Sequence, residues 1–453
     1  MSAAAPNILG VHGRLFADPH PAPDATSFQV DNTSAQYYQS PYYVAHKNQV
    51  QPVPAPRISP PRIDLAEVLG PDILGPVAAA KRITFHSVGD TGAAKVNAFQ
   101  TAVQALKNEE SVADAMTTDL EQGGPDAPVF FFHLGDVVYY FGEAQYYYDQ
   151  FYDPFRSYDR PIFAIPGNHD GAVFGAGATE PQVPTLEAFV RNFCGVTPGT
   201  SPDAGALVRS TMTQPGVYFT LDAPLVSIIG LYTNVLEGPG VLSSQQGKYP
   251  IGDDQLQFLT AELTRLKPLR AAGERAVVIA CHHPPVSVDS KHGGSTGLAT
   301  DIDTACQSAG FWPDAVMSGH AHLYQRFTRA TQNREIPYVV AGSGGFAATA
   351  PTTKIPAGGV TVGEYTLVAP PLVEFGFLTI TVDLGAQPPS LTIAFDSRGL
   401  ESVDTVTVDL AAGKLVTSRK SPARRRTGGR STTAGRHKTG GTRKSSTRRP
   451  RKK

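Results

Sequence analysis

The sequence predicts an α/β fold, and three features of its 453 residues indicate this class. Apolar runs of strand length begin near residue 82 and alternate with stretches of helical periodicity, which is typical of βαβ units. The runs are nearly continuous, as in VFFF and AVVIA, and such strands are buried on both faces of a sheet. More β-rich segments follow residue 337, so we expect a second sheet packed on the first.

The elements can be predicted in chain order. Three strands are expected in 82–90, 128–136 and 161–170, with helical segments in 93–108 and 143–155 between them. Beyond these we expect a strand pair in 216–234 with a turn near Asp222, and a helix in 253–269 that begins with an Asp cap. A strand in 276–285, a short helix in 300–307 and another strand in 314–322 are expected to follow.

Two terminal extensions flank this pattern. Residues 1–80 are rich in Pro, whose ring fixes φ and removes a backbone donor, so an extended Pro-rich arm is predicted. Residues 411–453 hold sixteen Lys and Arg, no acidic residue and few apolar ones, which predicts a disordered basic tail. A single domain is therefore expected over 81–410. Outside the tail, 23 basic residues face 40 acidic ones, so the body is acidic.

Composition excludes several protein classes. Cys194, Cys281 and Cys306 are too few and too scattered for a disulfide framework or a thiolate zinc site. No stretch reaches the roughly 18 to 20 apolar residues of a membrane span, and the N-terminus has no signal-peptide pattern. We expect a cytoplasmic protein, with export by another route left open.

Five separate segments each end a strand-like run with residues that bind metals. They read VGDTG, LGDVVY, IPGNHD, IACHH and SGHAH. In open α/β sheets, ligands gather outside the carboxyl ends of the strands, so we expect these side chains to converge. The predicted ligands of two adjacent metal ions are Asp90, Asp136, Tyr139, Asn168, His282, His320 and His322.

Ligand chemistry suggests how two ions would be held. Oxygen donors combined with imidazole suit iron, manganese or zinc. Asp136 is the natural bridge, because one carboxylate can give an oxygen to each ion. One ion would take Asp90, Tyr139 and His322, and the phenolate favours Fe(III) there. A divalent ion (Zn, Fe or Mn) would take Asn168, His282 and His320.

These motifs resemble the metallophosphoesterase superfamily, and specifically its purple acid phosphatase branch. Most of the superfamily has D-x-H at the first motif, whereas here Gly92 stands at the His position and Tyr139 supplies the replacement ligand. The resemblance covers roughly residues 82–346. It implies a four-layer αββα sandwich of two mixed β-sheets flanked by helices. It also implies a single catalytic domain, since residues 1–80 lack the strands of the β-sandwich that precedes it in plant-type members.

The resemblance and the ligand set together predict hydrolysis of phosphate monoesters, as in an acid phosphatase. A metal-bound hydroxide is expected to attack phosphorus in line. His169, next to Asn168, is the expected acid for the leaving group. His292 resembles the second substrate histidine of the family.

Two alternatives stay open at this point. A phosphodiesterase acting on cyclic nucleotides, lipid headgroups or nucleic acid would use the same ions. A polyanion-binding module could keep the metal site for structure alone. The basic tail would bind nucleic acid or polyphosphate through counterion release, or serve as a solvated tail. The sequence gives no oligomeric state.

Overall fold

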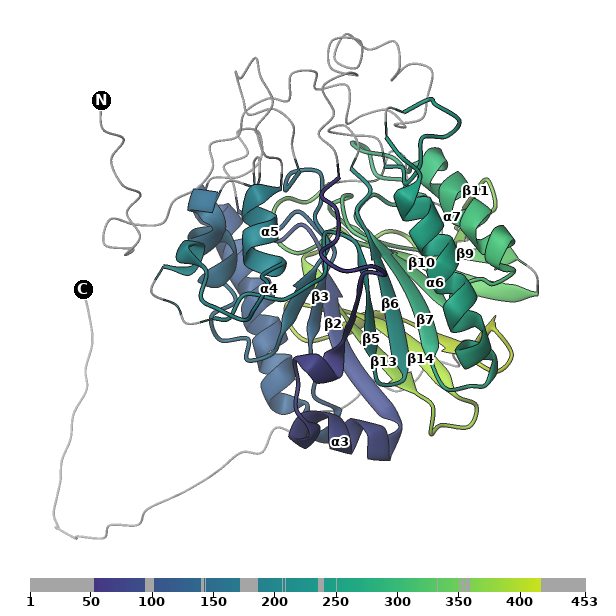
Figure 1. The fold of residues 1–453 in the computed structure, drawn as a ribbon, viewed down its shortest axis with the longest axis horizontal. Helices are drawn as coiled ribbons and strands as arrows, with labels where there is room; N and C mark the ends of the chain where they lie inside the picture. The colour runs from purple at the N-terminus through teal and green to yellow at the C-terminus, as the bar shows by residue number, and fades with distance from the viewer. Residues whose placement is uncertain are drawn as a thin grey trace, which may run out of the picture. The chain divides into compact units, whose positions relative to one another are not determined.

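Two mixed β-sheets pack face to face in the computed structural model, with helices on the outside (Figure 1). The predicted α/β class and four-layer arrangement are confirmed. The predicted basic tail beyond residue 416 and residues 1–52 of the predicted arm lie outside the described residues. The structure describes residues 53–93, 102–139, 142, 144–171, 186–205, 207, 209–234, 240–249, 251–331, 333–349, 351, 355 and 359–416.

The first sheet has seven strands. Its three parallel strands carry the first three predicted motifs, and antiparallel strands from the C-terminal part of the domain extend it on one side. In spatial order the strands are β16 (Lys414–Leu415), β15 (Ser402–Asp409), β14 (Ser390–Ser397), β13 (Gly376–Asp383), β2 (Arg82–Val88), β3 (Phe131–His133) and β4 (Ile162–Ala164).

The second sheet has nine strands. Four of them, β6, β7, β8 and β10, run parallel at its centre. In spatial order the strands are β1 (Arg62–Asp64), β5 (Phe219–Ala223), β6 (Val226–Leu231), β7 (Ala276–Cys281), β8 (Ala315–Ser318), β10 (Arg334–Ala341), β9 (Tyr324–Thr331), β12 (Tyr365–Leu367) and β11 (Val360–Val362).

Alternate residues of the central strands face two different cores. Ile228 of β6 and Val278 of β7 belong to the core between the sheets, whereas Ile229 and Ile279 belong to the core beneath the helices. Every second side chain of a strand points to the same face, so a strand buried on both faces reads as an unbroken apolar run. This is why the predicted strands could be recognised without alternation.

The helices lie outside the sheets and differ in part from the prediction. Helix α6 packs on β6, β7 and α7, and α4 packs on β13. The start of the predicted helix at 93–108 lies outside the described residues, and α4 continues fourteen residues past its predicted end. The α-helices are α3 (Pro71–Ala80), α4 (Ala102–Gln122), α5 (Glu187–Phe193), α6 (Asp254–Ala271) and α7 (Thr296–Ala309).

The segment predicted as helical over 143–155 forms no regular α-helix among its described residues. It contains η4 and the π-turn η5, which buries the side chain of Gln150. That side chain bonds the backbone of Tyr139, so a contact within the fold determines the local conformation. The short helices are η2 (Leu65–Glu67), η3 (Gly124–Asp126), η4 (Ala144–Tyr146), η5 (Tyr148–Tyr152) and η6 (Pro202–Ala204).

Part of the predicted arm belongs to the folded domain. Strand β1 adds to the edge of the nine-stranded sheet beside β5, and Ile63 and Leu65 are buried between the sheets. Pro71 opens α3, where a missing backbone N–H costs nothing. The arm boundary predicted at residue 80 therefore lies too late, because its prolines include one that begins a helix. At the other end, β16 extends the domain past the predicted boundary at 410.

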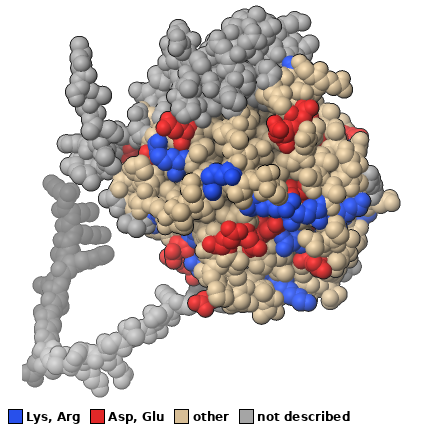
Figure 2. Space-filling view, in the orientation of Figure 1, with Lys and Arg blue, Asp and Glu red and all other residues tan. Residues whose placement is uncertain are grey.

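Basic and acidic side chains lie beside each other on the face of the domain shown in Figure 2. Elsewhere in the domain, Asp222 accepts hydrogen bonds from Arg265 and Arg275. The buried Glu262 carboxylate pairs with Arg62 and Arg265. Within the described part of the chain, no helix has the length and apolar character that crossing a bilayer requires.

Candidate metal centre

The seven predicted ligand side chains meet at the carboxyl ends of strands from both sheets. Each is at most 6% exposed to solvent. They come from the loops that follow β2, β3, β4, β7 and β8. These side chains, called here the seven-residue cluster, are Asp90, Asp136, Tyr139, Asn168, His282, His320 and His322.

Four atoms of the cluster form a first group. The Tyr139 hydroxyl oxygen lies 3.2 Å from Asp90 Oδ1 and 3.0 Å from Asp136 Oδ2. His322 Nε2 lies 3.3 Å from Asp90 Oδ1 and 3.5 Å from the Tyr139 hydroxyl. These four residues include every ligand predicted for the first ion.

A second group shares one oxygen with the first. His282 Nε2 lies 3.4 Å from Asp136 Oδ2 and 3.0 Å from Asn168 Oδ1. His320 Nδ1 lies 2.9 Å from the same Asn168 oxygen. One ligand atom each from Asp136, His282 and His320 falls within 4.8 Å of the others, which is close enough to hold one ion. Asp136 Oδ2 therefore lies in both groups.

The hydrogen bonds of His282 show that the cluster fits cations. Its Nδ1 lies 2.8 Å from the Leu134 carbonyl oxygen, which can only accept, so Nδ1 carries a proton. In the neutral ring Nε2 then presents a lone pair, and it faces the oxygens of Asp136 and Asn168. Lone pairs directed at one another repel unless a proton or a metal ion lies between them. A donor to a backbone carbonyl is also the usual orienting partner of a metal-binding His.

Three members of the cluster have a strained backbone. The φ angles of Asp90, Asp136 and His320 are 59°, 56° and 67°, in the left-handed region that non-glycine residues rarely adopt. Such positions cost about 1 to 3 kcal/mol each and cluster at functional sites. The backbone is also tight here: a Cβ on Gly319 would lie 2.7 Å from Asp90 Oδ2. The glycine beside each ligand thus permits the close approach.

Burial and mutual repulsion shift the pKa values of the acidic ligands. Burial, together with the repulsion of Asp136, raises the pKa of Asp90 to about 7, although the attraction of His282 acts in the opposite direction. For Asp136 burial also acts upward, but His282 and His169 outweigh it, and its pKa lies below the ordinary value. Burial lowers the pKa of His282, yet Asp136 raises it to about 9. A cation in the cluster would relieve these opposing charges.

The sequence itself identifies the family. The family model of the calcineurin-like phosphoesterases matches residues 83–324. The chain belongs to this family. The expected membership of the metallophosphoesterase superfamily is thereby confirmed. No curated protein matches the chain by sequence.

Several solved structures are similar to this chain. Purple acid phosphatase PPD1 from yellow lupin (Lupinus luteus) seeds has a TM-score of 0.49 at 16% identity, over 75% of this chain and 57% of that one. PhoD has a TM-score of 0.43 at 12% identity, over 80% of this chain and 73% of that one. A dimetal phosphatase from Danio rerio has a TM-score of 0.41 at 13% identity, over 72% of this chain and 99% of that one. The chain thus spans little more than half of the lupin protein, and the family assignment comes from the sequence match.

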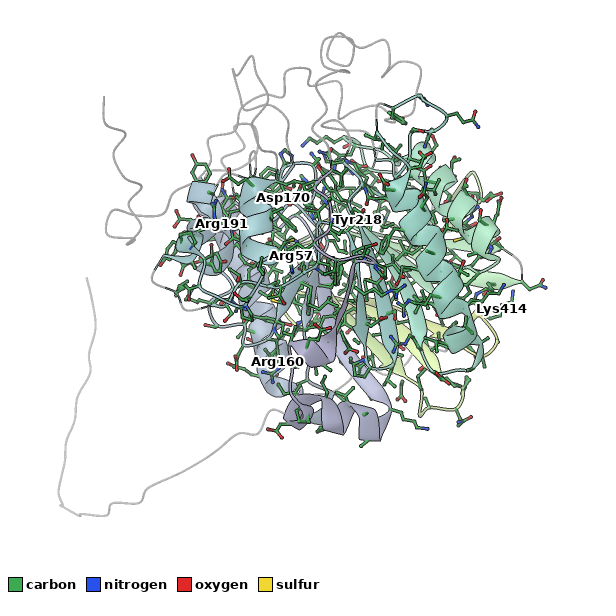
Figure 3. All side chains as sticks on the ribbon, viewed as in Figure 1. Arg57, Arg160, Asp170, Arg191, Tyr218 and Lys414 are labelled. Carbon is green, nitrogen blue, oxygen red and sulfur yellow. The ribbon has the colours of Figure 1, made fainter. Side chains whose placement is uncertain are left out.

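Asp170, which the sequence analysis did not single out, connects two of the motif loops. The Asp170 carboxylate accepts the backbone N–H groups of Val137, Val138 and Gly167, which joins the second motif loop to the third. Asp170 follows strand β4 and Arg160 precedes it, and Figure 3 shows the two residues toward opposite edges of the domain. The sequence did offer one indication of Asp170, because it is the last residue of the Asn-His-Asp motif.

Neighbouring residues fix both the backbone and the ring of Tyr139. Gln150 donates to its carbonyl at 2.7 Å and accepts its N–H at 2.8 Å. Phe346 stacks on its ring with centroids 3.6 Å apart and planes within 5°. Neither partner could be found from spacing, because Gln150 belongs to the short helix η5 and Phe346 to a loop far along the chain. The packing leaves the Tyr139 hydroxyl directed at Asp90 and Asp136.

The two predicted catalytic histidines lie on different sides of the cluster. The backbone N–H of His169 donates to Asp136 Oδ1 at 2.9 Å, and its half-buried ring lies 4.5 Å from the Tyr139 ring. The His292 ring lies 4.5 Å from that of His320 and 5.1 Å from that of His322. Burial, then the Lys291 charge, lowers the pKa of His292 to about 4. Both histidines therefore border the predicted ion positions.

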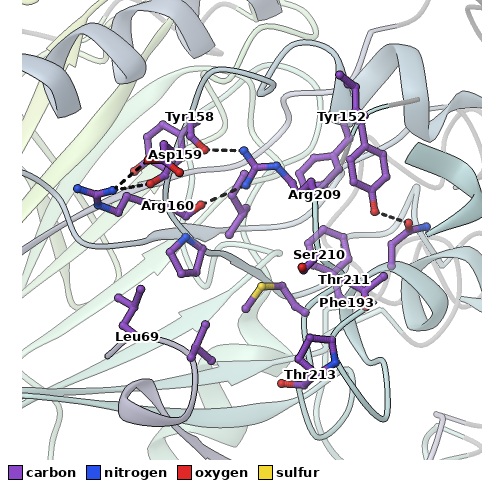
Figure 4. A pocket seen from close by; sticks show the side chains of 18 of the residues that line it. Leu69, Tyr152, Tyr158, Asp159, Arg160, Phe193, Arg209, Ser210, Thr211 and Thr213 are labelled. Carbon is purple, nitrogen blue, oxygen red and sulfur yellow. Dashed lines mark hydrogen bonds and ion pairs between the residues drawn. The ribbon is translucent and has the colours of Figure 1, made fainter. Parts of the chain in front are cut away.

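A separate cavity of about 670 Å³ lies away from this site (Figure 4). Its lining includes Arg160, which precedes strand β4, and Arg209. Arg209 donates to the carbonyl oxygens of Phe155, Tyr158 and Arg160. Its guanidinium thus secures a turn.

Proposed function

We propose that this calcineurin-like phosphoesterase hydrolyses phosphate monoesters at a dinuclear metal centre. The observation that carries the proposal is the shared oxygen: Asp136 Oδ2 lies within 3.4 Å of both Tyr139 and His282, one from each group of ligand atoms. When bound, two adjacent cations supply the hydroxide nucleophile and polarise the phosphate. The seven-residue cluster provides eight ligand positions when Asp136 is counted for both ions.

The ligand types support Fe(III) beside a divalent ion. The first group contains two carboxylates, a phenol oxygen and one imidazole, and hard anionic oxygens suit a trivalent ion. The second group contains two imidazoles, an amide oxygen and the shared carboxylate, which suits Zn, Fe(II) or Mn. With Tyr139 as a ligand, this pattern supports the purple acid phosphatase branch and an acid phosphatase-like activity.

The chain's own histidines would handle the leaving group and the substrate. His169 borders the first group, and its backbone is fixed by Asp136, so its ring is placed to give a proton to the departing alkoxide. His292 packs on His320 and His322 and faces the same space, where it would hold a phosphate oxygen. Both roles are part of the proposal.

Colour and metal content test the centre directly. A phenolate on Fe(III) gives a visible charge-transfer band, so we expect the concentrated protein to be coloured and to hold two metal ions per chain. Tyr139→Phe should remove the band. Tyr147→Phe is the matched control, because Tyr147 is equally buried and its hydroxyl has no hydrogen-bond partner within the described ranges. A single ion per chain at saturation would contradict the dinuclear centre.

A phosphodiesterase is the second candidate, since the same ions would serve it. Turnover of an aryl phosphate monoester and of the corresponding diester separates the two. We expect the monoester to be hydrolysed with the larger kcat/KM. A larger value for cyclic nucleotide, lipid headgroup or nucleic acid diesters would reverse the assignment.

The polyanion-binding alternative rests on the basic tail, which lies outside the described residues. The domain face in Figure 2 adds little to it, because basic groups there lie beside acidic ones. Deleting residues 417–453, which follow β16, and measuring retention on nucleic acid or polyphosphate across a salt series tests this role. Retention that does not change on deletion would refute a role of the tail in polyanion binding.

A further inference from the structure

The loop 284–295 is fixed above the seven-residue cluster by its own hydrogen bonds. Its ends are joined by the N–H of Ser295, which donates to the Pro284 carbonyl at 2.8 Å. Within it, the buried Asp289 carboxylate accepts the backbone N–H groups of Lys291, His292 and Gly293 at 2.7 to 2.9 Å. Three donors on one carboxylate leave this turn little conformational freedom.

The same turn is held against the predicted ligands. His292 packs its ring on those of His320 and His322. Its neighbour Lys291 therefore starts from a backbone position that is fixed relative to the cluster. Neither the motifs nor the resemblance pointed to Lys291, because a lysine in a Gly- and Ser-rich loop usually belongs to the solvated surface.

The ammonium group of Lys291 has no partner among the residues that the structure describes. The side chain is half-buried, and its nitrogen makes no hydrogen bond or ion pair with any residue in the described ranges. It does interact electrostatically with the cluster: burial lowers its pKa below the ordinary value, against the pull of Asp289, Asp136 and Asp90. The charge also acts on His292 and His322. A half-buried cation beside the seven-residue cluster, with no anionic partner in the part of the chain that the structure describes, has room for an anionic ligand.

We propose that Lys291 is a substrate-binding residue whose ammonium contacts the phosphate of the bound ester and favours dianionic monoesters over monoanionic diesters. The proposal rests on the hydrolytic function proposed above and deepens it by assigning the source of the selectivity. An ionised monoester carries about two negative charges near neutral pH, whereas a diester carries one. An additional fixed positive charge therefore stabilises the monoester complex more strongly.

Kinetics of Lys291→Met on the metal-loaded protein test this assignment. Methionine keeps most of the side-chain volume and removes the charge. We expect kcat/KM for an aryl monoester to fall about 10- to 100-fold, the range for loss of a charge-assisted hydrogen bond, while the value for the diester falls less than about threefold. Lys291→Arg should recover part of the loss. The inhibition constant of inorganic phosphate should rise with the loss of monoester activity.

Two controls keep the outcomes separate. Lys107→Met removes an exposed lysine of α4 and should leave both esters unaffected. Metal content should stay at the wild-type value in every variant. Equal losses on monoester and diester, or no loss on either, would overturn the role of Lys291. If the wild-type protein hydrolyses neither ester, the proposed function fails instead. Calorimetric binding of inorganic phosphate to the wild-type and Met proteins then decides on Lys291 alone, and equal affinities would refute it.

Discussion

The two ends of strand β8 hold buried charged groups with opposite arrangements. Asp314 precedes the strand and lies between two guanidinium groups: Arg270 donates to it at 2.8 and 2.9 Å, and Arg334 forms a further ion pair. The N–H of Val277 completes the set at 2.9 Å. Every acceptor of this carboxylate faces a donor. We call these residues the Asp314 cluster.

At the other end, His320 belongs to the seven-residue cluster, where acceptors outnumber donors. Burial and the nearby Asp136 raise the pKa of Asp90, and His282 Nε2 faces one oxygen each of Asp136 and Asn168. Strain adds to this, since Asp90, Asp136 and His320 all have positive φ. Burial alone therefore does not distinguish a structural charge from a functional one. The balance of hydrogen-bond donors and acceptors distinguishes them, because only the seven-residue cluster, with its excess of acceptors, would need a bound cation.

The largest effect is expected from Asp136→Ala. Removing the shared oxygen takes a ligand from both ions, so we expect metal content to collapse and activity to fall by more than about 10⁴-fold, since the ions provide most of the catalysis. Elemental analysis and aryl phosphate turnover measure this. After chelation, the unfolding free energy should fall less than for Asp314→Ala, because Asp136 lies near a second carboxylate. Full metal content in this variant would remove Asp136 as the bridge.

Asp314→Ala tests the balanced end of the strand. It leaves Arg270 and Arg334 without their acceptor, and breaking a buried ion pair costs about 3 to 5 kcal/mol. Urea unfolding should show this loss, while the folded fraction keeps both metal ions. Asp159→Ala, whose side chain is 99% exposed, is the control and should change stability by less than about 0.5 kcal/mol. A loss of metal with no loss of stability would erase the distinction between the two clusters.

His169→Ala addresses chemistry rather than metal binding. If His169 protonates the leaving group, kcat on alkyl phosphates should fall about 10²-fold or more, because an alkoxide leaves poorly without a proton. Esters with acidic leaving groups should lose far less. Comparing an alkyl and a nitrophenyl phosphate at equal metal content measures the difference. Equal losses on both would assign the acid elsewhere.

The sequence was sufficient to point to the seven side chains that the fold brings together, but not to the residues that support them. The strands could be predicted because their apolar runs are continuous, and the seven side chains because each motif follows such a run. Gln150 and Asp170 could not, since their roles depend on which backbone groups the fold brings to them. The Asp314 cluster joins residues 20 and 44 apart, with no spacing that marks them. Strand β1 was missed because its three residues lie among prolines.

The smallest effect is expected at Asp404, a second balanced carboxylate. It accepts from Tyr324 at 2.7 Å and from Arg326 at 2.6 Å. Burial alone would raise its pKa, but Arg326 outweighs burial and lowers the pKa below the ordinary value of 3.8. The ionised group is thus favoured in the folded protein, so its contribution is complete above the unfolded pKa and is lost as pH falls through the folded one.

Asp404→Asn should therefore cost about 1 to 2 kcal/mol of unfolding free energy at pH 7, the range for hydrogen bonds to a charged group. The difference from wild type should shrink as pH falls below about 4, where the unfolded carboxyl becomes protonated. Urea unfolding across pH 3 to 7 measures this, with Asp159→Asn as the control for an exposed carboxylate. A difference that stays constant down to pH 3 would mean that the amide fails to fit rather than that the charge is missing. The balanced clusters would then owe their stability to shape more than to charge.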